Sequence, residues 1–366
     1  MDYTIGKSDK MDPYEVLDEI TEGFEKPILI LYFTPVEIFK EFSEILSVKY
    51  PDSVCMGATT RIAITKSWVN ESGSVAVAFE SGISCSAGIL KNINKYPIKY
   101  ASEVKRALNE IDETENTICF ELSTGLMGGE ESVLSTLNSV LHKEKIKVVG
   151  GSAGNISGDT TYVSLNGRIL DNSAVFVLIH NKYGAIHYFR ENIYEPMNDN
   201  KIIATDVDLK KRIVREYNHR PAIDVYAEEL GVPVENIEEQ LDKHPVGRFV
   251  GNRMFITANK SITEDRGIQY HSRIYNNTRL SVLKPADYRE VNEETFDKIK
   301  EEVPEPSFTI LVHCLARTEL FLNDGYMKEY SKKFGAELGS YIGFSGYGEQ
   351  YSRYNFNMTA IIIVFE

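Results

Sequence analysis

Cysteine is scarce in this chain, and its spacing excludes two kinds of covalent or metal support. The 366 residues include only four cysteines, Cys55, Cys85, Cys119 and Cys314. None is near another in sequence, and none forms a C-x-x-C pair. This spacing argues against a disulfide framework and against a zinc knuckle, and it favours a reducing compartment.

Long hydrophobic runs are also absent. The longest apolar runs are six to eight residues, whereas a membrane helix needs about 20. Residues 1–10 are polar and lack the apolar stretch that follows the basic start of a signal peptide. We therefore expect a cytoplasmic protein without a membrane partner.

Positive charge is in short supply. The formal net charge is −14, and the longest basic run is only Lys210-Lys211-Arg212. Nucleic-acid binding requires a basic stripe that attracts phosphates, and an anionic membrane surface would repel this chain overall. Nucleic acids and membranes are therefore not expected partners.

Recognisable catalytic and metal-binding motifs are missing as well. The chain has no G-x-S-x-G turn, no P-loop lysine, no kinase signature and no H-E-x-x-H. No two of its seven histidines lie four residues apart. We expect no enzyme activity, no metal and no cofactor. The open alternative is a haem held by a single histidine, His271 or His244.

What the chain does have is a threefold internal repeat. Residues 26–80, 116–179 and 306–365 each begin with an apolar run, continue through a helical pattern, reach a glycine in a small-residue cluster and close on another apolar run. The glycines are Gly57, Gly150 and Gly343. This pattern predicts a strand–helix–strand–strand unit used three times, with a glycine-lined crevice in each unit. Since 42% of residues are hydrophobic, the chain can bury a core.

Composition changes near residue 205 and predicts a division of the chain. Residues 209–217, 222–230 and 236–241 are rich in helix formers. We expect an N-terminal helical extension over residues 1–26 and two domains over residues 27–212 and 213–366. The fold class is α/β or α+β, with mixed sheets built from the repeated units.

Two glycine-rich runs, Gly150–Asn155 and Gly343–Glu349, are the first candidates for a binding site. Backbone N–H groups in such loops can approach a polar ligand that bulky side chains would block. The alternative for the first run is a tight strand exit that needs positive φ.

The end of the strand before residue 315 supplies further candidates. Arg317 could clamp a carboxylate, and Glu349 could receive an ammonium group. Cys314 could be a nucleophile, although a buried, inert thiol is the commoner case. The expected ligand-binding residues are Gly150, Gly151, Ser152, Asn155, Cys314, Arg317, Ser345, Tyr347 and Glu349.

In the order of its motifs the chain resembles a FIST protein, with a FIST N-terminal domain (27–212) followed by a FIST C-terminal domain (213–366). The resemblance rests on the Gly57 cluster, Gly150–Gly154, Arg220-Pro221-Ala222, His244–Gly247, Cys314–Arg317 and Gly343–Glu349. It implies a bacterial sensory module for small ligands such as amino acids, and in some members a link to haem and nitric oxide.

The resemblance also implies partners in signal transduction. Because the chain carries no kinase, chemoreceptor or nucleotide-cyclase segment, we expect a separate partner such as a histidine kinase, a chemoreceptor or a cyclic-dinucleotide enzyme. The hypothesis is that a small zwitterion or anion binds between the two domains. An enzyme using Cys314 as nucleophile is the other alternative.

Overall fold

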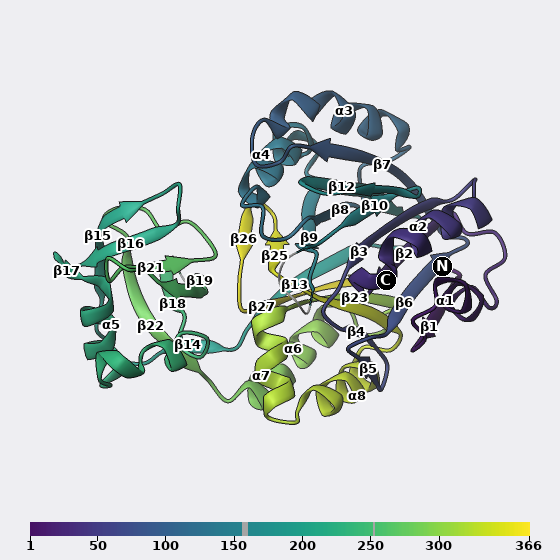
Figure 1. Ribbon diagram of the computed structural model, residues 1–366. Helices are drawn as coiled ribbons and strands as arrows, with labels where there is room; N and C mark the ends of the chain where they lie inside the picture. Colours follow the sequence, from purple (N-terminus) through teal and green to yellow (C-terminus); the bar gives the residue numbers. More distant parts are fainter. Residues whose placement is uncertain (156–159, 252) are drawn as a thin grey trace. The chain divides into compact units, whose positions relative to one another are not determined.

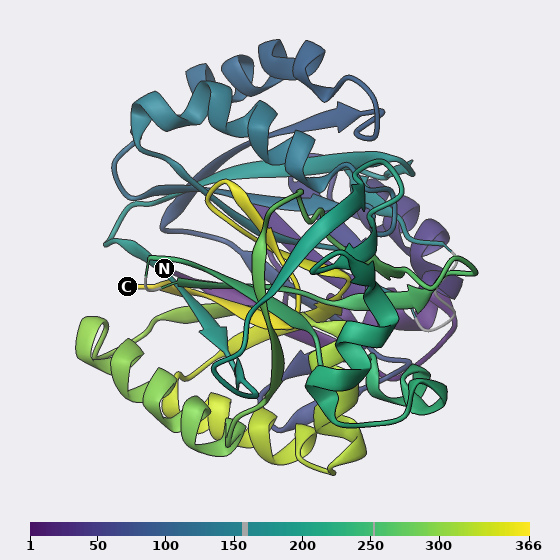
Figure 2. The ribbon, with the colours of Figure 1, turned by 90° about the vertical axis from the view of Figure 1, so that its left-hand side faces the viewer.

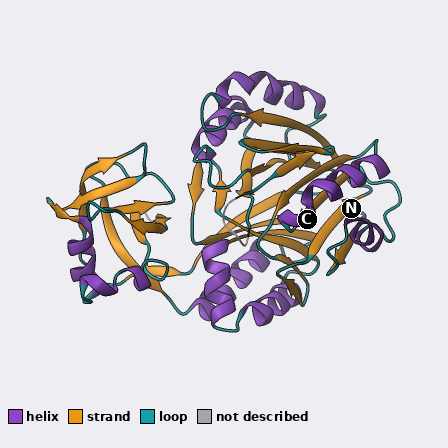
Figure 3. Cartoon of the chain, in the orientation of Figure 1, coloured by secondary structure: helices purple, strands orange, loops and turns teal. Residues whose placement is uncertain are grey.

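The computed structural model describes residues 1–155, 160–251 and 253–366 (Figure 1). The chain forms two compact units. Unit 1 comprises residues 1–190, 295–355 and 360–366, and unit 2 comprises residues 191–294 and 356–359. Both contain helices and mixed or antiparallel sheets, which confirms the predicted α+β fold class (Figure 3).

The compact units are discontinuous in sequence, unlike the continuous division that the sequence analysis expects at residue 212. The third repeat folds into unit 1 with the other two, and unit 2 is an insertion between repeats 2 and 3. The first 26 residues also differ from a purely helical extension, because Tyr3–Ser8 is a strand that pairs with Ser74–Phe79.

Unit 1 is built around three six-stranded sheets with the same strand order. We name them after the repeat that supplies their central strands. The first sheet runs β1 (Tyr3–Ser8), β6 (Ser74–Phe79), β2 (Leu29–Thr34), β3 (Val54–Thr59), β10 (Val163–Leu165), β11 (Arg168–Leu170). The second runs β7 (Ile83–Lys91), β12 (Ser173–Asn181), β8 (Thr117–Ser123), β9 (Lys147–Ser152), β25 (Gly348–Tyr351), β26 (Tyr354–Phe356). The third runs β13 (Ile186–Asn192), β27 (Thr359–Phe365), β23 (Phe308–Cys314), β24 (Tyr341–Gly346), β4 (Ala63–Thr65), β5 (Trp68–Asn70).

The three repeats exchange hairpins in a cycle. In each repeat the first two strands pair in parallel through a crossover helix, and the last strand pairs antiparallel with the first. The hairpin β4–β5 of repeat 1 joins the third sheet, β10–β11 of repeat 2 joins the first, and β25–β26 of repeat 3 joins the second. The predicted repeat is therefore confirmed, and each sheet is completed by a neighbouring repeat.

The inner faces of the three sheets form one hydrophobic core. Leu31, Phe120 and Val312, from the first strands of the three repeats, belong to the same buried cluster. These strands alternate inward and outward side chains, as the period of a strand requires. Burying a side chain of this size contributes about 1.5–3 kcal/mol relative to leaving it in water.

Helices cover the outer faces of the sheets in unit 1 (Figure 3). The first sheet packs against α1 (Pro13–Ile20) and α2 (Val36–Lys49), and the second against α3 (Ala101–Glu110) and α4 (Glu130–Leu141). On the third sheet lie α7 (Leu315–Asn323) and α8 (Met327–Glu337), with α6 (Tyr288–Glu302) packed on α8 through Phe296. Asp12 caps α1 by accepting from Tyr14 N and Glu15 N, and Pro13 is its first residue, as the sequence indicates.

The described residues of unit 2 form mostly antiparallel sheet, with the helix α5 (Ala222–Leu230) and the first part of α6. Its strands are β14 (Tyr194–Pro196), β15 (Ile202–Asp208), β16 (Ile213–Tyr217), β17 (Arg220–Pro221), β18 (Val246–Val250), β19 (Arg253–Thr257), β20 (Asn259–Ile262), β21 (Ile268–Tyr270) and β22 (Arg279–Pro285). Its core gathers residues of α5 and of the strands β15, β16 and β22. Across the residues described in both units, no helix is long and apolar enough to cross a membrane.

Candidate functional site

The second strands of the three repeats end in loops that hydrogen-bond to one another in a cycle. In each repeat, the N–H four residues after the central glycine donates to the C=O that lies two residues after the glycine of another repeat. The three bonds are Gly154 N to Thr59 O at 2.8 Å, Tyr347 N to Ser152 O at 3.2 Å and Arg61 N to Ser345 O at 3.1 Å. Three polar chain segments that are far apart in sequence therefore meet at one end of the sheets.

All nine predicted ligand-binding residues belong to unit 1. Eight lie on these loops or on adjoining strands, and Arg317 lies in the first turn of α7. The hairpin exchange places Glu349 opposite Gly151, and Gly348 opposite Ser152. Tyr347 Oη donates to Asn155 O at 3.1 Å. Cys314 pairs with Gly346, next to Ser345. The two predicted runs are thus side by side, although nothing in the sequence spacing requires it.

Arg317 and Glu349 are both fully buried, with no exposed side-chain surface. Arg317 is in the first turn of α7, and its guanidinium carbon lies 5.0 Å from the ring centre of Phe321 and 5.8 Å from that of Tyr330. Glu349 is on β25, which contacts β23. Charged groups are rarely buried, because losing water costs several kcal/mol, and such groups concentrate at functional sites.

His313 lies beside Arg317 in a buried network that the sequence did not single out. Its Nδ1 is 2.8 Å from Thr318 Oγ1, which is 2.8 Å from Ser345 Oγ. Burial and then the positive charge of Arg317 hold the pKa of His313 well below its usual value, so the imidazole is neutral. Thr318 is one turn along α7, where it also donates to Cys314 O.

A second buried polar patch lies on the helix-covered face of the second sheet and was also missed. Glu121 has no exposed surface, and its Oε2 accepts from Ser123 Oγ at 2.8 Å. On the other side of Gly150, Gln350 Nε2 donates to Ser152 Oγ at 3.0 Å. Burial, with a smaller contribution from the charge of Glu130, raises the pKa of Glu121 to about 8. An acid inside the apolar run of residues 117–122 is the signal that could have revealed it.

The family models that match the sequence cover most of the chain. The FIST N domain matches residues 28–220, and the FIST C domain matches residues 222–352. The chain belongs to the FIST family. FIST domains are sensory domains of signal transduction. No curated protein matches the sequence.

The central glycines of this FIST protein accommodate close packing within the sheets. A Cβ added to Gly57 would lie 2.3 Å from the ring of Tyr32, and one added to Gly150 would lie 1.9 Å from Glu121 O. The space beside these two residues is therefore filled, so they do not line open crevices. Gly150, Gly151 and Gly154 do not have positive φ. The alternative explanation of this run, a tight strand exit that needs positive φ, is therefore wrong. A ligand contact at Gly150 or Gly151 stays a prediction.

Cys314 does not share a face of the sheet with its neighbour His313. Successive residues of a strand point to opposite sides, and His313 faces Thr318 on the helix-covered side. Cys314 is 3% exposed and precedes the first residue of α7. A Cys–His pair of adjacent residues is therefore excluded by geometry, while a nucleophilic role with another base stays a prediction.

The two histidines proposed as haem ligands belong to unit 2. Burial, followed by the charges of Lys260 and Arg212, lowers the pKa of His271 to about 4, so its imidazole is neutral, the form that binds a metal. His244 Nδ1 is 2.9 Å from Leu283 O. Haem binding at either histidine stays a prediction. The described residues contain no group of three or more His, Cys, Asp or Glu that could hold a metal ion.

Proposed function

We propose that this FIST protein is a cytoplasmic bacterial sensor that binds an amino acid or a similar small polar metabolite without catalysis. The observation that carries the proposal is that two fully buried groups of opposite charge each adjoin the converging strand ends of unit 1, Arg317 in the first turn after β23 and Glu349 on β25 opposite Gly151. A zwitterion offers the complementary charges. Its occupancy is then reported to a separate signalling protein.

Arg317 is suited to the carboxylate of such a ligand. A guanidinium presents parallel N–H groups that bind both carboxylate oxygens at once. The rings of Phe321 and Tyr330 lie near its guanidinium carbon, and aromatic faces favour a nearby cation and restrict its rotation. Lysine carries the same charge but lacks this planar fork.

Glu349 is suited to the ammonium group. It pairs in register with Gly151, so its carboxylate starts from the strand that adjoins the glycine-rich loop. Ser152, Asn155 and Tyr347 add hydroxyl, amide and phenol groups around the same strand ends. This mixture of one anion, one cation and neutral donors favours a small zwitterion over an apolar ligand.

The test combines native mass spectrometry of the purified protein with calorimetry and thermal shift against amino acids, carboxylates and nucleosides. We expect a retained or added zwitterion to bind, and Arg317→Lys and Glu349→Gln each to weaken binding at least tenfold. Arg220→Lys is the matched control, because Arg220 forms an exposed ion pair with Glu228 in unit 2. Circular dichroism checks that each variant folds. A protein that retains nothing and binds none of these compounds would refute the proposal.

A further inference from the structure

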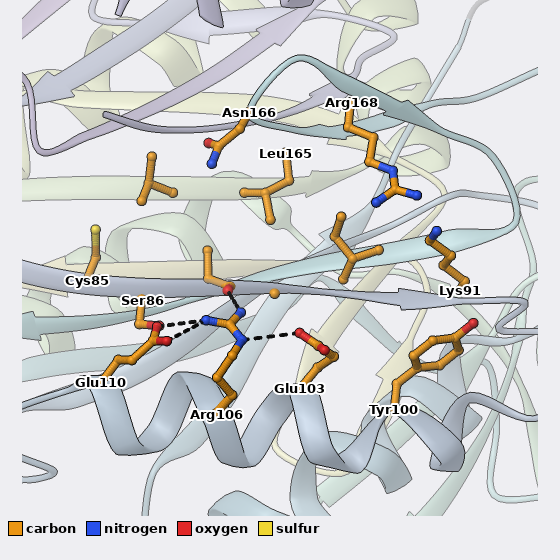
Figure 4. Close-up of a pocket in the computed structure, with 14 residues that line it drawn as sticks. Cys85, Ser86, Lys91, Tyr100, Glu103, Arg106, Glu110, Leu165, Asn166 and Arg168 are labelled. Carbon is orange, nitrogen blue, oxygen red and sulfur yellow. Dashed lines mark hydrogen bonds and ion pairs between the residues drawn. The ribbon is translucent and has the colours of Figure 1, made fainter. Parts of the chain in front are cut away.

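A polar groove of about 540 Å³ runs beside the edge strand β7, away from the converging strand ends (Figure 4). Its floor is formed by residues 85–89 of β7. One wall comes from α3, with Glu103 and Arg106, and from Tyr100 just before it. The other wall comes from the β10–β11 hairpin, with Leu165, Asn166 and Arg168. The groove is therefore a slot between the edge of the second sheet and the hairpin of the first.

The backbone of β7 presents hydrogen-bonding groups to this slot. β7 pairs with β12 along one side only and is the last strand of its sheet. Arg106 Nη2 donates to Ala87 O at 2.7 Å, so the backbone of Ala87 points to the open side. Because backbone groups alternate along an antiparallel strand, Cys85 and Ile89 point the same way. Arg106 thus covers one carbonyl of an otherwise open edge.

The other two repeats provide an internal comparison, because each has an equivalent junction between an edge strand and a hairpin. Between β1 and β5, Lys7 Nζ lies 5.5 Å from the Trp68 ring centre. Between β13 and the β25–β26 hairpin, the rings of Tyr188 and Tyr351 meet edge to face, with their centres 5.4 Å apart. Ala87 of β7 pairs with Val177 of β12, and Ile5 of β1 pairs with Val77 of β6. Because β12 and β6 are equivalent strands of two repeats, Ala87 and Ile5 occupy the same register position. At this register position the edge strand of the second sheet therefore has a smaller side chain than the edge strand of the first sheet.

The slot carries positive charge in an acidic protein. Lys91 and Arg168 lie at the same end of it in Figure 4. Within residues 1–155, 160–251 and 253–366, neither forms an ion pair. The charge of Arg106 is offset by Glu103 and Glu110 on the same helix. The groove thus favours an acidic occupant.

We propose that β7 binds an extended acidic segment of a separate signalling protein by strand addition. The segment would pair with Cys85, Ala87 and Ile89, displace Arg106 from Ala87 O and direct its carboxylates to Lys91 and Arg168. Strand addition obtains its affinity from main-chain hydrogen bonds and its selectivity from alternate side chains.

The experiment uses the full chain and a fluorescein-labelled peptide of alternating valine and aspartate, seven residues long, which matches Cys85–Lys91. We expect an increase in fluorescence anisotropy, and slower amide hydrogen exchange at Cys85, Ala87 and Ile89. The same peptide with lysine in place of aspartate, and one N-methylated at alternate residues, should bind at least tenfold more weakly. Equal binding of the N-methylated peptide, or no protection in β7, would overturn the proposal.

Variants separate the groove from nonspecific charge effects. Lys91→Glu with Arg168→Glu should weaken binding of the aspartate peptide at least tenfold, and Ala87→Tyr should block it by filling the slot. Arg220→Glu in unit 2 changes an exposed charge outside the groove and should leave binding unchanged. If Ala87→Tyr fails to fold, the double charge variant still decides the outcome. Unchanged binding to that folded variant would overturn the proposal.

Discussion

Glu121 shows how one side chain can make the stability of this protein depend on pH. It lies on the central strand β8 with no exposure to solvent, and its Oε2 accepts a hydrogen bond from the hydroxyl of Ser123. Burial raises its pKa from 4.5 to about 8. Near pH 7 the folded protein therefore holds a proton on Glu121 that the unfolded chain has released.

The sign of the resulting pH dependence follows from this proton. Between about pH 4.5 and about pH 8 the folded state binds more protons than the unfolded state, so the free energy of unfolding falls as pH rises, by up to about 1.4 kcal/mol per pH unit. Glu121→Gln should remove this slope, which urea denaturation at several pH values between 5 and 8 would measure. Identical slopes in the variant and the wild type would contradict the assignment.

The sequence predicted residues of the converging strand ends better than it predicted their partners. Glycine-rich runs are visible as local composition, so Gly150–Asn155 and Gly343–Glu349 could be selected. The network of His313, Thr318 and Ser345 depends on strand register and on one helical turn. Those contacts join residues up to 32 positions apart, between His313 and Ser345, and local patterns do not encode them.

At the scale of elements, the close parallel pairing of the first two strands explains why glycine recurs in the second strand of each repeat. Gly150 pairs with Glu121 on one side and with Gln350 from repeat 3 on the other. Its neighbours approach so closely that a methyl group would overlap Glu121 O. The glycine lets the first two strands of repeat 2 lie close together.

This packing makes a specific prediction for glycine substitutions. Gly150→Ala should lower the free energy of unfolding by about 3 kcal/mol or more, because the backbone must move to accept a Cβ. Gly325→Ala is the control in the same unit. It has φ of +66° and no atom within 4 Å of an added Cβ, so its cost should be about 1–2 kcal/mol of backbone strain. Thermal or urea unfolding compares the two, and equal costs would contradict the packing argument.

Other elements show where the sequence pattern fails. Residues 222–230 are the predicted helix α5, and Asn166-Gly167 forms the expected turn of a hairpin. Residues 209–217, predicted as helix, instead contain β16, which pairs with β15, β17 and β21. Residues 213–217 gain backbone partners on both sides in the sheet, and these nonlocal bonds override a weak local helix preference.

At the scale of the whole molecule, the three repeats of unit 1 form a closed cycle, in which each repeat completes the sheet of another. The two chain termini interrupt this cycle at one point. The turns after β6 and β12 lie together, since Lys182 N donates to Gly82 O. Asn181 Nδ2 donates to Glu366 O, and Ser81 Oγ donates to Asp2. Both termini thus lie beside these turns, and the two views show the termini close together (Figures 1 and 2). In the second and third sheets, the outer strand is the one that follows the last strand of the preceding repeat, β7 after β6 and β13 after β12. In the first sheet, β1 takes the place that a strand after β27 would take.

A circular permutant tests this cycle. Joining Glu366 to Met1 through a linker of about six glycine and serine residues, and opening the exposed loop between Asp112 and Glu113, should give a folded protein. Its circular dichroism spectrum should match the parent's, and its Tm should stay within a few degrees. The control carries the same linker at residue 366 without the new opening. A soluble control beside an unfolded permutant would refute the cycle.

The exchange of hairpins also sets an order on the ribosome. Every strand of the first sheet has been synthesised by residue 170, whereas the second sheet lacks its last strand until residue 356 and the third until residue 365. A nascent chain must therefore carry two unfinished sheets through most of translation. Their exposed apolar faces are natural substrates for chaperones until the final strands emerge.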